Sequence, residues 1–391
     1  MLNSDTHVAI PPFVERADGE DVLIGNPASN CFLSVGPDAV ALLRWLAEGL
    51  TIGQASAAYA ARYGETPDVQ GFLASLVDQR FLTLAPTPGA AEPAAPVRGH
   101  FAGISVDLAR KLCSWPALVV GALVAACAVA ACVEDPSIVP SPAALVFEHD
   151  QLGLALGVAI TTLVTVFFHE LAHLVAARAA DVPARIGVAN RLWVLVAETD
   201  MRGIWLAAQP QRCVAFLAGS AVDVFMTALL LLALFTNDAA HWFALDQTVV
   251  VLVRATIFVL FTRLLWQLYL FLPTDLYYVI ATLCGCKNLM QDTQAYLINQ
   301  LAHVARSVRR IDQSDVPHRE MRIVRWFAFV WLGGRAIAFA SLFLITLPVL
   351  AGYAAMIGRG VVGDDRAMHA FVDGPPLLIL AAGLQSIGLV A

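Results

Sequence analysis

The chain has 391 residues, of which 59% are hydrophobic and only 14% charged, and its mean hydropathy is +0.70. These values exclude an ordinary soluble globular protein and indicate an α-helical membrane protein with several spans. The formal net charge of −7 provides no basic surface for nucleic acid, so we expect no nucleic-acid partner. The seven cysteines are odd in number and scattered, which is not the pattern of a disulfide framework.

The first 85 residues have the mixed polar and apolar composition of a small soluble domain. Turn signals at Asp18-Gly19 and Asn26-Pro27 separate three expected strands at 13–16, 21–25 and 31–35, and 80–84 is a candidate for a last strand. Three helices are expected between 31–35 and 80–84. The first covers 37–48, the second begins at the Thr51-x-x-Gln54 capping box, and the third has an apolar face over 69–77. The pattern predicts an α+β domain of winged-helix type.

This order of elements resembles the PqqD-like recognition element, which binds the leader segment of a ribosomally made precursor peptide. The resemblance covers only the first domain, and it implies that a leader strand pairs with an exposed sheet edge. In this sequence the edge is expected near Cys31–Val35, beside the helix Val69–Gln79. A winged helix that docks on its own membrane domain, or that binds DNA, is the alternative. The lack of a Lys/Arg cluster between 37 and 85 argues against DNA.

A Pro/Ala-rich stretch, 86–97, opens a linker and juxtamembrane segment that we extend to residue 114. Six spans are expected after it, at 115–133, 152–180, 213–236, 249–273, 323–352 and 375–391. Lys and Arg gather before the first span, after the second and after the fourth, whereas 134–151 and 237–248 contain neither. The positive-inside rule therefore predicts a multi-pass protein of the cell (inner) membrane with both termini, and the N-terminal domain, in the cytoplasm.

The second expected span carries the sequence HELAH, from His169 to His173. Polar and ionisable groups are costly in hydrocarbon, so their presence in a spanning helix indicates a function. Positions i and i+4 share one helix face, which lets the two imidazoles converge on one metal ion with Glu170 beside its open coordination position. We therefore interpret HELAH as an HExxH zinc-hydrolase motif, with His169 and His173 as ligands and Glu170 as general base.

A catalytic zinc site needs a third protein ligand, and Asp275 is the preferred candidate. The fourth expected span ends at Leu272-Pro273-Thr274-Asp275, on the side of the membrane where the histidines lie. Glu198 and Asp200 are rival ligands in the polar segment 197–202. With the alternating residues 192–196, that segment is expected to form membrane-associated strands that present substrate backbone near the zinc.

These motifs together resemble the site-2 protease family of intramembrane zinc metalloproteases, over about 150–280. The family binds zinc through its HExxH histidines and an Asp of an LDG-type motif, which implies the ligands His169, His173 and Asp275 here. The stretch Ala218–Asp223 is similar to the family's AGPxxN, with Asp223 in place of Asn. No Gly follows Asp275, and this variant looks more like the peptide zinc metalloproteases found with peptide-modification systems. Residues 285–391 carry no resemblance.

Two further ionisable residues lie at equal depth in the third and fourth expected spans, Asp223 and Arg263. One interpretation is a buried structural ion pair, because neither charge is tolerated alone in a membrane. The other is that Asp223 accepts a hydrogen bond from a zinc-bound histidine and orients it. The first is the favoured interpretation.

The function expected from these residues is removal of the leader from a ribosomally synthesised, modified peptide by a membrane zinc endopeptidase. Its partners would be the precursor peptide and the lipid bilayer, with a metalloprotease core at 115–284 that opens to the cytoplasm, followed by an amphipathic segment and C-terminal spans at 285–391. Substrate-binding residues cannot be assigned from the sequence. One alternative is a regulatory intramembrane protease that cleaves signalling proteins or signal peptides; the other is a non-enzymatic export or immunity component.

Overall fold

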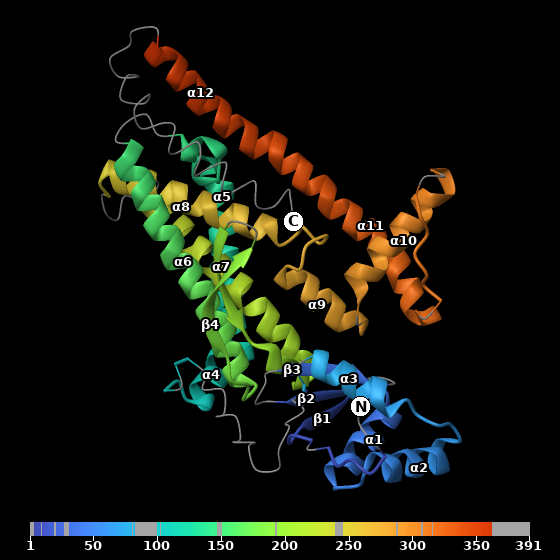
Figure 1. Cartoon of the computed structure of the whole chain (residues 1–391). Coiled ribbons are helices and arrows are strands. Elements are labelled where there is room, and N and C mark those ends of the chain that lie inside the picture. Colours follow the sequence, from blue (N-terminus) through green and yellow to red (C-terminus); the bar gives the residue numbers. More distant parts are fainter. Residues whose placement is uncertain are drawn as a thin grey trace. The chain divides into compact units, whose positions relative to one another are not determined.

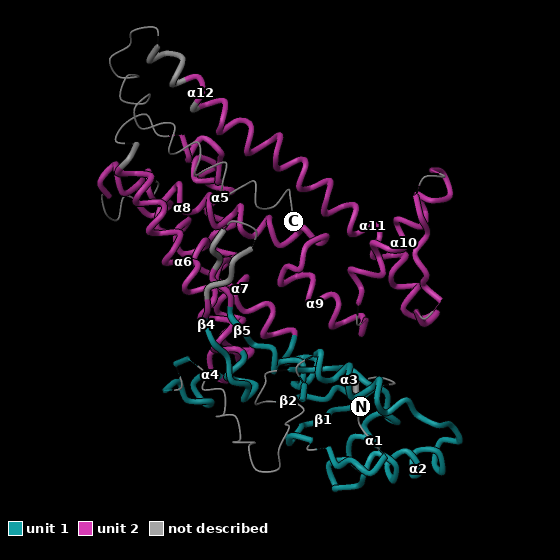
Figure 2. The backbone as a smooth tube through the Cα atoms, in the orientation of Figure 1, with its two compact units in different colours: residues 1–109, 177–186, 199–212 teal, residues 110–176, 187–198, 213–391 magenta. Residues whose placement is uncertain are grey.

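The computed structural model describes residues 4–8, 10–18, 21–26, 31–79, 81–82, 100–101, 103–146, 151–191, 194–238, 245–286, 288–305, 308–314 and 316–361. The described chain is mostly helical (Figure 1). It divides into two compact units (Figure 2), and each is described by itself. Unit 1 contains residues 1–109, 177–186 and 199–212, and unit 2 contains the rest.

Unit 1 begins with an antiparallel sheet in the order β1-β2-β3 followed by three helices. The strands are β1 (Val14–Asp18), β2 (Asp21–Asn26) and β3 (Cys31–Val35), and the helices are α1 (Pro37–Ala47), α2 (Ile52–Tyr63) and α3 (Val69–Asp78). The expected strands and helices of this region are thus confirmed. The candidate last strand is not: the two described residues of 80–84, Phe81 and Leu82, lie outside any strand.

Local sequence explains these elements. Thr51 and Gln54 form the predicted capping box, in which each side chain bonds the other residue's backbone N–H. The apolar faces of α1 and α3 bury Leu43 and Leu73 against Ile24 of β2. Phe81 is fully buried in the same core, because the chain after α3 turns inward instead of pairing with the sheet.

A segment distant in sequence completes unit 1. The 3₁₀ turn η3 (Arg202–Leu206) packs against the N-terminal sheet: a Cβ on Gly25 would lie 3.0 Å from Leu206 Cδ1, and Arg16 donates a hydrogen bond to the Leu206 carbonyl. Nothing in the local sequence had indicated that 199–212 would join the N-terminal elements.

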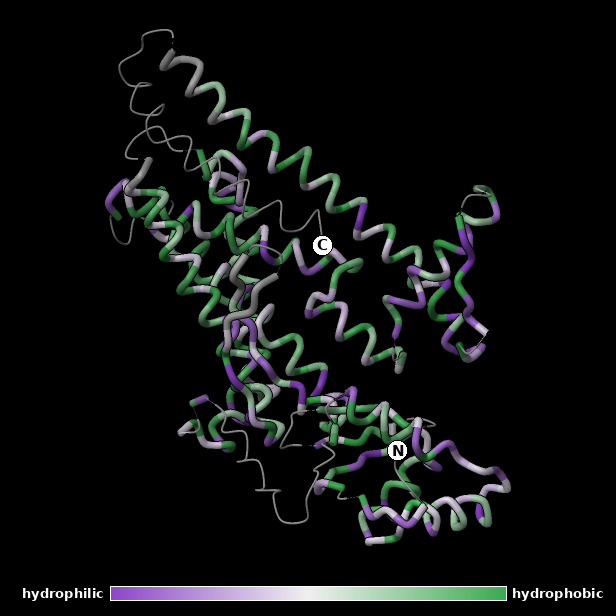
Figure 3. The backbone as a smooth tube through the Cα atoms, in the orientation of Figure 1, coloured by the Kyte–Doolittle hydropathy of each residue, from purple (hydrophilic) through white to green (hydrophobic). Residues whose placement is uncertain are grey.

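Unit 2 contains most of the apolar helices. Five helical stretches are long and apolar enough to cross a membrane: 106–134, 153–179, 209–237, 247–266 and 318–352. They correspond to the first five expected spans, while the sixth, 375–391, lies outside the described residues. Apolar positions predominate along these helices, with hydrophilic positions between them (Figure 3). This architecture is consistent with a helical membrane protein.

The elements of this part follow in chain order. They are α4 (Val106–Leu112), α5 (Trp115–Glu134), the turns η1 (Pro136–Ile138) and η2 (Pro142–Leu145), α6 (Gln151–Ala179), α7 (Gln209–Asp238), α8 (Gln247–Trp266), α9 (Asp275–Cys284), α10 (Leu289–Val304), α11 (His318–Ser341) and α12 (Leu347–Val361). A π-helical turn, Leu342–Thr346, joins α11 to α12. It precedes Pro348, whose ring cannot follow regular α-helical hydrogen bonding.

The fourth span is shorter than expected. The prediction of a helix over 249–273 is wrong at its end, because α8 stops at Trp266 and the chain runs irregularly from 267 to 274 before α9 begins. Pro273 disfavours helical geometry in the residue before it, and Thr274 caps the new helix by accepting from the Tyr277 N–H. We call residues 267–274 the ligand arm, since they lead directly to Asp275.

The segment between α6 and α7 forms the two-stranded sheet of β4 (Arg185–Arg191) and β5 (Val194–Asp200). β5 confirms a strand within 192–202, where strands were expected, whereas β4 precedes that segment.

Candidate metal centre

Three candidate ligands converge inside unit 2. His169 and His173 lie one turn apart on α6, and their Nε2 atoms are 3.2 Å apart. The Oδ2 atom of Asp275, at the start of α9, lies 3.3 Å from Nε2 of His169 and 3.4 Å from Nε2 of His173. The three residues are thus brought together in a group able to hold one metal ion.

The separations fit zinc. Ligand atoms about 2.0–2.1 Å from a tetrahedral Zn²⁺ lie about 3.3–3.4 Å from one another, because a tetrahedral angle fixes that distance. The three edges of the triangle, 3.2, 3.3 and 3.4 Å, have this size. A triangle of three ligands also leaves the fourth tetrahedral position for water or substrate, as in catalytic sites.

The outer nitrogens of the two histidine rings, the Nδ1 atoms that face away from the group, have partners that set the tautomers of the rings. His173 Nδ1 lies 2.8 Å from the Ala215 carbonyl oxygen, which can only accept, so this nitrogen carries the proton. His169 Nδ1 lies 2.9 Å from the Asp223 carboxylate and donates to it in the same way. In the neutral rings both Nε2 atoms therefore point lone pairs at each other and at Asp275. Such a cluster of lone pairs is repulsive unless a cation lies between them.

Asp223 makes the contact that each of the two alternatives requires, one to Arg263 and one to His169. Its side chain is fully buried, and its carboxylate accepts from His169 Nδ1 and from Arg263 Nε at 2.7 Å, with a further bond from Arg263 Nη2. Arg263 also reaches the backbone and hydroxyl oxygens of Thr165, each at 3.4 Å. The ion pair and the orientation of a histidine are thus one connected network.

This network follows a polar stripe on α6. Thr161, Thr165, His169 and His173 recur every four residues, so they share one helix face. Thr161 Oγ1 is 3.0 Å from Thr256 Oγ1 of α8, one step further from the metal group than the Thr165–Arg263 contact. The stripe thus continues from the metal group into the membrane-spanning part of α6.

Gly219 of α7 forms the wall of the site, although it was not among the expected site residues. A Cβ at this position would lie 2.5 Å from Nε2 of both His169 and His173. Any side chain here would therefore occupy the space where the ligand atoms meet. The available signal was its place four residues before Asp223, on the same helix face, within the stretch that resembles AGPxxN.

Gln267 is a second residue that sequence reasoning missed. Its Nε2 donates to Asp275 Oδ2 at 3.1 Å, and its Oε1 accepts from the Asp275 backbone N–H at 3.1 Å. The Thr274 hydroxyl donates to the Gln267 carbonyl at the same distance. One glutamine at the end of α8 therefore fixes the ligand carboxylate across the ligand arm.

Glu170 is 9% exposed and follows the first ligand on α6. It precedes His173 by three positions, so it shares that histidine's side of the helix. Glu170 is thus a buried carboxylate on the part of α6 that carries the two histidines.

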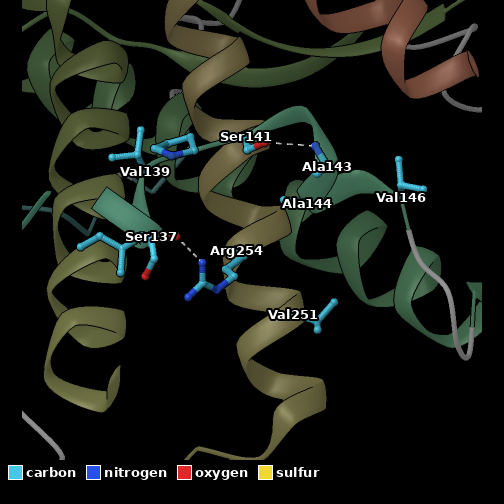
Figure 4. A pocket seen from close by; sticks show the side chains of 10 residues that line it. Ser137, Val139, Ser141, Ala143, Ala144, Val146, Val251 and Arg254 are labelled. Atoms are coloured by element: carbon cyan, nitrogen blue, oxygen red, sulfur yellow. Dashed lines mark hydrogen bonds between the residues drawn. The ribbon is translucent and has the colours of Figure 1, made fainter. Parts of the chain in front are cut away.

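The rival ligands do not join the group. Among the described residues, His169, His173 and Asp275 form the candidate metal cluster, while Asp200 is paired with Arg202 at 2.9 Å. A cavity of about 310 Å³ lies elsewhere in unit 2, between the η1–η2 segment and α8 (Figure 4). It is lined by Arg254 and Ser137 among others and by none of the metal candidates, so it is not this site.

Comparisons with known proteins found no matching family model, no similar curated protein and no similar solved structure. The interpretation of the site therefore depends on its own geometry.

Proposed function

We propose that this protein is a membrane-embedded zinc endopeptidase that removes the leader from a ribosomally synthesised, modified peptide precursor. The observation that carries the proposal is the triangle formed by Nε2 of His169, Nε2 of His173 and the Asp275 carboxylate, with edges of 3.2–3.4 Å. The partners of the two Nδ1 atoms leave both Nε2 atoms available as ligands. The HELAH sequence adds Glu170 beside it. Structural zinc sites are closed by four protein ligands, whereas three ligands and a neighbouring carboxylate are typical of hydrolases.

Zinc at this position would lower the pKa of a bound water toward neutrality and polarise the carbonyl of the scissile peptide bond. Glu170 would take the proton from that water and return it to the amide nitrogen as the C–N bond breaks. Asp223 would keep His169 oriented and its Nδ1 proton in place, and Ala215 would do the same for His173.

The N-terminal elements support a peptide substrate. Among the described strands, β3 pairs with β2 on one side only, which leaves its other edge for an added strand. Cys31 Sγ at the start of β3 donates to the Gln79 carbonyl, so the end of α3 borders that edge. A leader peptide bound here would raise the local concentration of the precursor, and the catalytic site itself need not be selective. The sheet β4–β5 offers a further edge for holding an extended substrate.

The five apolar helices support a location in a membrane, and the distribution of Lys and Arg favours the cell membrane with the N-terminal domain in the cytoplasm. The two other candidates from the sequence, a regulatory intramembrane protease and a non-enzymatic export or immunity component, become outcomes of the test.

The test is co-expression of the full chain with the precursor peptide encoded beside its gene, followed by mass spectrometry of the peptide. Glu170→Gln is expected to lower processing by about 10²–10⁴-fold while the zinc content stays unchanged. Glu134→Gln, at the exposed end of α5, is the matched control and is expected to process normally.

Equal processing by the Glu170→Gln protein would contradict the hydrolase proposal and favour the export or immunity alternative. Loss of the N-terminal domain without effect on cleavage would instead favour the regulatory protease.

A further inference from the structure

Contacts along the long helix α11–α12 show which part of it lies level with α8. α8 has 20 residues, which is about 30 Å of helix and one hydrocarbon thickness. Gly334 of α11 packs on the ligand arm just beyond the end of α8: a Cβ there would lie 2.8 Å from the Leu270 nitrogen and 3.0 Å from the Leu268 oxygen. Gly334 therefore lies level with the end of α8, which we take as one membrane boundary.

The opposite boundary is marked by Gly352, whose added Cβ would lie 3.0 Å from Val146 Cγ2. Val146 lines the same cavity as Val251, which is in the first turns of α8 (Figure 4). From Gly334 to Gly352 the chain advances 18 residues (352 − 334), or about 27 Å of helix. This again matches one hydrocarbon thickness, so Arg335 lies at the boundary near the ligand arm and not in the middle of the bilayer.

The guanidinium of Arg335 lies against two aromatic rings that are themselves in edge-to-face contact. Its Cζ lies 4.7 Å from the Trp331 ring centroid and 5.1 Å from that of Phe271, which belongs to the ligand arm. Trp266 and Tyr269 continue the aromatic group, with ring centroids 5.1 Å apart. Trp and Tyr at the end of a spanning helix are typical of the level of lipid headgroups.

Among the residues that the structure describes, the N–H donors of Arg335 have no hydrogen-bond acceptor. Its side chain is exposed, and within the described ranges its contacts are these two rings, with neither a hydrogen bond nor an ion pair to any described residue. An aromatic ring attracts the cation without supplying a strong hydrogen-bond acceptor, so the N–H groups can still donate to the oxygens of a phosphate or carboxylate. By contrast, Arg254 near the other end of α8 donates to the Ser137 carbonyl.

We propose that Arg335, supported by Trp331 and Phe271, binds the phosphate of an anionic phospholipid at the membrane surface beside the metal centre. Phosphate is the anion that is always present at this depth, and one arginine near an anionic surface contributes enough binding energy for about a fivefold preference. The bound lipid would hold Phe271, and with it the ligand arm that carries Asp275. This proposal does not depend on peptidase activity.

Native mass spectrometry of the detergent-purified full chain, titrated with phosphatidylglycerol or phosphatidylcholine, tests it. The wild-type protein is expected to retain phosphatidylglycerol in preference to phosphatidylcholine. Arg335→Gln is expected to lose about fivefold in phosphatidylglycerol affinity. Arg254→Gln is the matched control, and its affinity is expected to stay unchanged because Arg254 already bonds Ser137.

A second variant guards against misfolding. Arg335→Lys keeps the charge, so it is expected to fold and to retain a reduced preference for phosphatidylglycerol. Unchanged phosphatidylglycerol binding by a folded Arg335→Gln protein would overturn the proposal. The proposal would also be overturned if Arg335→Gln lost affinity only for peptides with a free carboxylate and kept its affinity for phosphatidylglycerol. Arg335 would then be a substrate contact.

Discussion

The two halves of the candidate metal centre are built differently. His169 and His173 belong to one unbroken helix, and their outer nitrogens bond α7 through Asp223 and Ala215. Asp275 stands at the first turn of a short helix, after an irregular arm, and its carboxylate is held by the side chain of Gln267. The histidine half is therefore fixed by regular backbone geometry, and the aspartate half by a few side-chain contacts that can be lost singly.

This difference indicates where the site can be damaged. Substitutions in the histidine half fall either at Gly219, where the helices are closely packed, or in the buried Asp223–Arg263 ion pair. They should therefore abolish metal binding or destabilise the fold. Changes in the aspartate half should weaken metal binding by graded amounts, because the arm can still bring Asp275 near the histidines.

The largest effect is expected from Gly219→Ala. The added Cβ would lie 2.5 Å from both Nε2 atoms, so zinc binding should be lost. The helix itself should tolerate alanine, which is favoured over glycine in helix interiors by about 1 kcal/mol. Zinc content and thermal unfolding with and without a chelator are the measurements. Gly121→Ala on α5, where a Cβ meets open space, is the control. Full zinc content in the Gly219→Ala protein would contradict the assigned site.

The Asp223–Arg263 pair should behave as a unit. Asp223→Asn or Arg263→Gln alone leaves one buried charge without its partner and should cost about 3–5 kcal/mol of stability. The double variant removes both charges and should recover much of that loss, with a coupling energy of about 0.5–3 kcal/mol. Unfolding of all four proteins measures the cycle, and the absorption spectrum of bound Co²⁺ reports the effect on the centre. Additive losses would show that the two residues act separately.

Gln267→Ala tests the aspartate half. It removes both hydrogen bonds to Asp275, and loss of a residue that orients a metal ligand typically weakens affinity by about 10–100-fold. Competition with a zinc chelator measures the affinity. The exposed Gln247, at the other end of α8, provides the control variant Gln247→Ala. If both variants bind zinc like the wild type, Gln267 does not position the ligand.

The smallest effect is expected from Gly334→Ala, which presses on the back of the ligand arm. Its Cβ would lie 2.8 Å from the Leu270 nitrogen, and overpacking of this kind costs about 1–3 kcal/mol. A lower unfolding temperature with a modest loss of zinc affinity is the expected result. Gly333→Ala, whose Cβ meets no neighbour within 4 Å, should be neutral. If Gly334→Ala and Gly333→Ala have the same unfolding temperature and zinc affinity, α11 does not support the ligand arm.

The histidine half could be predicted from the sequence because its information is local. Two histidines four residues apart share a helix face whatever the rest of the chain does, and an apolar context excludes a casual surface position. Asp275 was reachable as well, since a carboxylate at the end of an apolar stretch is costly unless a cation lies beside it. The N-terminal strands and helices followed from turn and cap signals, which are also local.

The residues that support these ligands could not be found in this way. Gln267 was taken as part of a longer span, and its role depends on α8 ending at Trp266 and the chain folding back. Gly219 has no side chain with a functional group, so the sequence gives no chemical reason to select it. Its role depends on the packing of α7 against α6. The joining of 199–212 to the N-terminal sheet is likewise a tertiary contact with no local signature.

The polar stripe on α6 makes that helix sensitive to the number of its residues. Thr161, Thr165, His169 and His173 face partners on α7 and α8 at four-residue steps. One residue inserted between Thr165 and His169 would turn the two ends of α6 by about 100° relative to each other, so either the threonines or the histidines would lose their partners. Insertion before residue 161 leaves the stripe intact. Point substitutions can thus accumulate along the lipid-facing side of this helix, while its length between the threonines and the histidines is fixed.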